Sequence, residues 1–136
     1  MRSLKIVALS LIATAFVANA GAVEDSVKLD VKKVCDVKAN GLEKVLAVAE
    51  KYNPVAQKNG VEFMRFSIPN SAYIAGAKEA IKAKSKEATL KYKKKGKAKT
   101  KKFPTEYATW RACMFALRAV QQIDEANKTY TSSIPK

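Results

Sequence analysis

Histidine is absent from this 136-residue chain. Its absence removes the side chain that most often serves as a general base or as a metal ligand. Neither a G-x-G-x-x-G string nor a P-loop string occurs. The Ser-x-x-Lys string at 133–136 lies in the C-terminal tail, where we interpret it as chance. We therefore expect no catalytic residues, no metal site, no cofactor and no enzymatic activity.

Long apolar runs are also scarce, and the one candidate lies at the N-terminus. Residues 1–20 have a basic start, an apolar run at 6–17 and the small-residue ending Ala-Asn-Ala. This three-part layout is typical of a secretory signal peptide, and the apolar run is short for a membrane span. We expect cleavage after Ala20, with Ala22 as the alternative, and a periplasmic or secreted mature protein.

Cysteine occurs only twice, at Cys35 and Cys113, and both lie in the predicted mature chain. An even number of cysteines in an exported protein favours a disulfide. The spacing is not C-x-x-C, which argues against a redox pair. The sequence predicts a structural Cys35–Cys113 bridge that joins distant parts of the chain.

Acidic residues are few: 12 Asp and Glu face 26 Lys and Arg, for a net charge of +14. Residues 78–102 alone hold 12 lysines and two glutamates, a local charge of +10. Without Arg2 and Lys5 the mature chain carries +12, so the rest of it carries only +2. The basic character is therefore concentrated in one segment.

That segment is the first candidate site. Because lysine is a hydrated point charge on a flexible stem, a lysine run suits loose attraction to a polyanion better than a shaped pocket. Possible partners are lipopolysaccharide or cell-wall phosphates, nucleic acid, or an acidic protein, with peripheral attachment at most to a membrane. The alternative is a solvated linker that keeps the protein soluble, and the sequence leaves both open. The candidate anion-binding residues are Lys91, Lys93, Lys94, Lys95, Lys97, Lys99, Lys101 and Lys102.

The strongest helical pattern lies at residues 103–127. Its large side chains recur at three- and four-residue steps, which lays them along one side of a helix. We expect this helix to begin near Thr105, whose hydroxyl can accept a hydrogen bond from the first turn. The core stripe is predicted from Phe103, Tyr107, Trp110, Met114 and Leu117, with Cys113 and Val120 beside it.

A second stripe on this helix is formed by Arg111, Phe115, Arg118 and Gln122. Arginine is scarce in the mature chain, and Phe115 is a large aromatic residue among polar neighbours. The stripe is a candidate contact for a partner or for self-association. The structural alternative is that Phe115 faces another helix while the arginines flank it and pair with acidic residues.

The remaining segments are predicted to be mostly helical. Residues 27–37 fit a helix and also fit the alternation of a strand, and the helical continuation through 42–52 favours helix. Residues 61–68 fit either an edge strand or a helical turn. A further helix is expected to start at residue 70 or 71 and to extend towards residue 95, followed by a basic loop at about 91–102.

The sequence thus predicts an all-α fold, a bundle of three or four helices in one domain at 21–136, stapled by one disulfide. The expected function is a non-enzymatic binding or structural role in the bacterial envelope, using the Lys-rich segment for anionic partners. The alternative is a small periplasmic chaperone or stress protein, which rests on general outline alone. Neither the identity of the partner nor the oligomeric state follows from the sequence.

Overall fold

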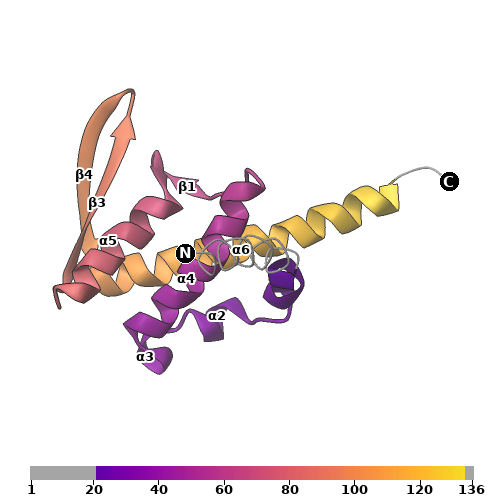
Figure 1. The fold of residues 1–136 in the computed structure, drawn as a ribbon, viewed down its shortest axis with the longest axis horizontal. Helices are drawn as coiled ribbons and strands as arrows, with labels where there is room; N and C mark the ends of the chain where they lie inside the picture. The colour runs from indigo at the N-terminus through magenta and orange to yellow at the C-terminus, as the bar shows by residue number, and fades with distance from the viewer. Residues whose placement is uncertain (1–20, 134–136) are drawn as a thin grey trace, which may run out of the picture.

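The computed structural model describes residues 21–133, with side chains described up to residue 128 (Figure 1). The predicted signal peptide at 1–20 lies outside the described residues. Residues 21–27 are helical. The elements that follow are α2 (Val31–Val34), α3 (Val37–Asn40), α4 (Leu42–Lys58), β1 (Met64–Arg65), β2 (Ile68–Pro69), α5 (Asn70–Lys82), β3 (Glu87–Lys94), β4 (Lys97–Pro104) and α6 (Thr105–Ser133).

Helix α6 is the central element, and α4 and α5 both pack against it. Its fully buried side is lined largely by alanine, at Ala108, Ala112 and Ala116, with Leu117 completing the contact. Small side chains let neighbouring helices approach closely, which explains why this side rather than the aromatic stripe is innermost. Among the predicted core stripe, Trp110 and its large neighbours are only half-buried.

The N-terminal part is a series of short helices, so the strand alternative for residues 27–37 is wrong. The predicted helix is confirmed only in part, because residues 28–30 and 35–36 interrupt it. Asp30 and Asp36 each accept hydrogen bonds from backbone N–H groups of the helix that follows, α2 and α3 respectively. Such caps satisfy N–H groups that have no partner within the helix.

The predicted disulfide is confirmed: Cys35, directly after α2, is bonded to Cys113 in α6, with a Cα–Cα distance of 5.6 Å. Both cysteines are fully buried. On the same side of α6, the Gln121 amide donates to the backbone carbonyls of Ser26 and Leu29. The beginning of the described chain is thus fixed to the central helix at two places.

The all-α prediction is wrong, because the chain also forms two antiparallel hairpins and the fold is mixed. The larger hairpin, β3–β4, is built by the Lys-rich segment. The helix predicted to continue towards residue 95 ends at Lys82, and the predicted loop at 91–102 consists of two paired strands. Its two turn residues, Lys95 and Gly96, have φ of 52° and 77°, as the favoured two-residue hairpin turn requires.

The hairpin has no apolar outer layer, so its pairing depends on packing at its base. Helix α5 lies against β3 at Gly76, where an added Cβ would lie 2.8 Å from the Thr89 carbonyl oxygen and 2.9 Å from Leu90 Cδ1. Only glycine permits this close approach. The contact holds β3 close along α5.

The smaller hairpin, β1–β2, resolves the segment at 61–68 in favour of strands. Its turn residues Phe66 and Ser67 have φ of 53° and 66°, which is uncommon for residues other than glycine. Behind it, Glu62 accepts hydrogen bonds from the Asn53 amide and from the Ser71 backbone N–H at the start of α5. This carboxylate, rather than a side chain of residue 70 or 71, thus caps α5.

Candidate anion-binding site

The strand register sorts the eight candidate lysines onto two faces of the β3–β4 hairpin. Side chains of alternate residues lie on opposite faces, and Ala88 and Leu90 are fully buried. We call their side the inner face; it carries Lys94, Lys97, Lys99 and Lys101, together with Tyr92 and Phe103. The outer face carries Lys91, Lys93 and Lys102, while Lys95 occupies the turn. All eight lysines are exposed.

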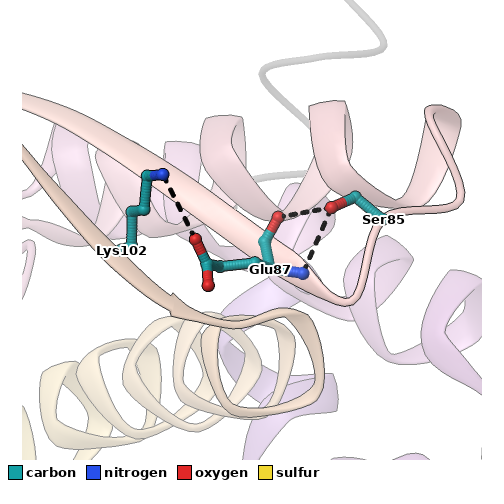
Figure 2. Close-up of polar contacts among 3 residues, drawn as sticks. All are labelled: Ser85, Glu87 and Lys102. Carbon is teal, nitrogen blue, oxygen red and sulfur yellow. Dashed lines mark hydrogen bonds and ion pairs between the residues drawn. The ribbon is translucent and has the colours of Figure 1, made fainter.

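The base of the hairpin is fixed by polar contacts, and Figure 2 shows those among Ser85, Glu87 and Lys102. The Ser85 hydroxyl donates to the Glu87 carbonyl at 2.9 Å and accepts from the Glu87 N–H at 3.2 Å. Lys102 Nζ lies 3.5 Å from Glu87 Oε1. The Thr105 hydroxyl donates to the Ser85 carbonyl at 2.7 Å, so it ties α6 to the hairpin instead of accepting from its own helix as predicted.

Charge on the hairpin is almost entirely of one sign. Residues 87–104 contain eight lysines and one glutamate, for a formal charge of +7. The glutamate, Glu87, is paired with Lys102 at the base. Among the described side chains, none of the other hairpin lysines, including those near the turn, forms an ion pair. Their positive potential therefore reaches solvent without local compensation.

Six aromatic rings form a continuous ladder that includes Phe103 of the inner face. Successive ring centroids lie 5.4 to 6.3 Å apart, within the range of favourable aromatic pairs. Burial raises the pKa of the Tyr73 hydroxyl in the middle of the ladder, and the nearby Tyr107 hydroxyl acts in the same direction. In order of contact the rings are Phe63, Phe115, Tyr73, Phe103, Tyr107 and Trp110.

Arg111 is a cation held inside this ladder. Only 8% of the residue is exposed, and its guanidinium carbon lies 4.5 Å from the centre of the Phe115 ring and 5.5 Å from that of Tyr107. Its buried Nε donates to no acceptor in the described part of the chain. Cation–π attraction therefore replaces a carboxylate partner at this position.

These contacts bear on the predicted partner stripe. Phe115 packs edge-on against Phe63 and Tyr73, as the structural alternative has it. Arg111 covers the Phe115 ring, and among the described side chains it forms no ion pair with an acid, so that part of the alternative is wrong. Arg118 and Gln122 are exposed on the following turns. Two members of the stripe are thus engaged within the fold, and the other two remain accessible.

The tip of the β1–β2 hairpin lies beside the inner face and is unusually apolar for an exposed turn. Met64 is 65% exposed and Phe66 is 66% exposed. Lys101 Nζ of the inner face lies 5.4 Å from the Phe66 ring centre, and the Arg65 guanidinium lies 5.0 Å from it. Figure 1 shows both hairpins rising from the same side of the helical body. Positive charge and exposed apolar surface are therefore adjacent.

Other kinds of site have less support within residues 21–133. No cluster of three or more potential His, Cys, Asp or Glu ligands occurs there. None of the helices described is both long enough and apolar enough to cross a membrane. An open hollow of about 910 Å³ near the hairpin base is bordered by charged side chains of both signs, including Lys84, Lys86 and Glu106.

Sequence reasoning named the lysines as candidates but missed the aromatic ladder, because its rings come from distant segments. It also missed the exposed tip, because large apolar side chains such as Met64 and Phe66 are usually part of the core. The available signal was the alternation of Ala88, Leu90 and Tyr92 ahead of Gly96, which is typical of a strand leading into a turn. Comparison of the chain with protein-family models, curated proteins and solved structures finds no match. The functional assignment therefore depends on the charges and rings of the two hairpins.

Proposed function

We propose that this protein is an exported, non-enzymatic envelope protein that binds polyanions through the β3–β4 hairpin. The observation that carries the proposal is the hairpin's formal charge of +7 on a projecting element whose lysines are all exposed. A polyanion gains affinity from such an element because each neutralised phosphate or sulfate releases bound counterions. Export to the periplasm or the cell exterior is supported by the Cys35–Cys113 disulfide, which is typical of oxidising compartments.

The hairpin presents these charges better than a mobile loop would. Paired strands hold side chains on one face about 7 Å apart along each strand, so several lysines meet a chain of anions together. The anchored base limits the entropy that is lost when the ligand binds. The lysine side chains remain flexible, which suits a repeating anion more than one defined small molecule.

The test is a salt titration of heparin binding by the wild-type protein and by a variant with Lys93, Lys94, Lys95, Lys97, Lys99, Lys101 and Lys102 replaced by glutamine. For the wild type, the logarithm of the association constant should fall linearly with the logarithm of salt concentration, and the variant should show a much smaller slope. Far-ultraviolet circular dichroism and thermal melting serve as folding controls.

A light-scattering assay of client aggregation separates this proposal from the chaperone alternative. A chaperone would protect a denatured client through exposed apolar surface, with little dependence on salt or on the hairpin lysines. Heparin binding that is absent or independent of salt, together with full client protection by the glutamine variant, would reject the polyanion proposal.

A further inference from the structure

The two hairpins together present exposed apolar surface beside positive charge, and binding of a polyanion by charge alone would not need the apolar part. On one side stands the inner face, with its row of lysines. Beside it lies the β1–β2 tip with Met64 and Phe66, the two most exposed of the large apolar residues that the structure describes. Lys101 joins the two parts, because its Nζ lies 5.4 Å from the Phe66 ring and 5.3 Å from the Phe103 ring.

The backbone at the tip supports a functional reading of this exposure. Phe66 occupies the left-handed region with φ of 53°, a conformation that costs free energy for a residue with a bulky side chain. The residue nevertheless remains 66% exposed, so burial within the fold offsets little of that cost. An apolar layer outside the protein would provide that burial.

We propose that the inner face and the β1–β2 tip form one amphipathic docking surface for a membrane of anionic phospholipid. The inner-face lysines contact headgroup phosphates, and Phe66 and Met64 enter the apolar layer beneath them. Juxtamembrane lysines gain about 1 kcal/mol each near an anionic leaflet, and aromatic rings favour the interfacial region. The inference rests on the proposed anion binding by the hairpin and specifies its target.

Single-stranded nucleic acid is the main competing ligand. Bases need accessible rings on which to stack, and the ladder rings are packed against one another. Among the side chains that the structure describes, Phe66 is the one large aromatic residue that is strongly exposed, and its exposed neighbour in the chain is the non-planar Met64. An acyl layer accommodates both side chains, whereas a base stacks only on the ring.

The experiment measures co-sedimentation of the full protein with vesicles of phosphatidylglycerol and phosphatidylcholine, and with vesicles of phosphatidylcholine alone. Binding should require phosphatidylglycerol. Phe66→Ser should lower vesicle affinity about tenfold through the lost apolar contact, while heparin affinity stays within about twofold of the wild type. Val27→Ser is the matched control, because Val27 is 43% exposed on the N-terminal helix, and it should leave both affinities unchanged.

A second pair of variants tests which face of the hairpin is used. The double replacement Lys97→Gln and Lys99→Gln removes two inner charges, whereas Lys91→Gln and Lys93→Gln removes two outer charges from the same hairpin. The inner variant should bind vesicles about thirtyfold more weakly than the wild type. The fold-loss of the outer variant should be at least fivefold smaller than the fold-loss of the inner variant.

The outcomes distinguish this inference from the function on which it rests. Retained heparin binding with no binding to phosphatidylglycerol vesicles, or equal losses for the Phe66 and Val27 variants, would overturn the membrane inference alone. The same holds if Phe66→Ser weakens binding to single-stranded DNA and not to vesicles. Absence of both heparin and vesicle binding would instead reject the proposed function.

Discussion

Replacing Gly76 by alanine tests the packing that makes the Lys-rich segment a hairpin. At an unhindered position inside a helix, this change stabilises the fold by about 1 kcal/mol, because alanine has the higher helix propensity. Here the new Cβ would lie 2.8 Å from the Thr89 carbonyl oxygen, so α5 and β3 must move apart. Overpacking of this kind typically costs about 1–3 kcal/mol. Because the obstructing atom belongs to the backbone, we expect a net loss of about 1–2 kcal/mol.

Urea denaturation of Gly76→Ala and of the wild type measures this difference. Ala75→Gly is the matched control, since Ala75 is exposed on the same helix and should lose about 1 kcal/mol from propensity alone. A Gly76→Ala protein that is more stable than the wild type by about 1 kcal/mol would refute the close α5–β3 contact. A continuous helix through residues 71–95 would give that contrary result.

Three further predictions concern the core. Replacing Cys35 and Cys113 by serine should lower the free energy of unfolding, measured with urea, by up to about 4.5 kcal/mol, because the bridge restricts a loop of 78 residues in the unfolded chain. An unchanged urea midpoint would contradict a stabilising bridge. Phe115→Ala should lower the melting temperature at least as much as Trp110→Ala, because Phe115 contacts two rings and a guanidinium. A negligible loss would show that Phe115 is instead an exposed residue available to a partner. Burial raises the pKa of Tyr73, so folding favours the neutral hydroxyl. The contribution of this group to the free energy of unfolding is fully present below a pH of about 10 and is lost as pH rises through the raised pKa. Tyr73→Phe should therefore lose less stability than the wild type between pH 8 and 11, and parallel losses would refute this.

The helical parts of the fold were largely predictable because their patterns are local. The central helix was expected to begin at Thr105, and it does. The disulfide followed from two cysteines and an expected export route. The alanine-lined side of α6 was harder to anticipate, because hydrophobic patterns draw attention to large side chains such as Trp110, which lies half-buried.

The β3–β4 hairpin was missed for a physical reason. Lysine has low intrinsic preference for strands, and runs of like charge are typical of loops. The strands form because tertiary packing at Gly76 and Leu90 overrides that local preference. Within the candidate site, the lysines could therefore be named from the sequence, whereas their division between two faces and the proximity of Phe66 required the fold.

An amide map of the protein by nuclear magnetic resonance during titration with heparin tests the central claim most directly. We expect the largest chemical-shift changes in residues 91–102, with inner-face positions such as Lys97 and Lys99 exceeding outer positions such as Lys91 and Lys93. Changes at those positions should disappear on addition of salt, as counterion release requires. Shift changes confined to the exposed face of α6 around Arg118, or none at all at low salt, would contradict polyanion binding by the hairpin.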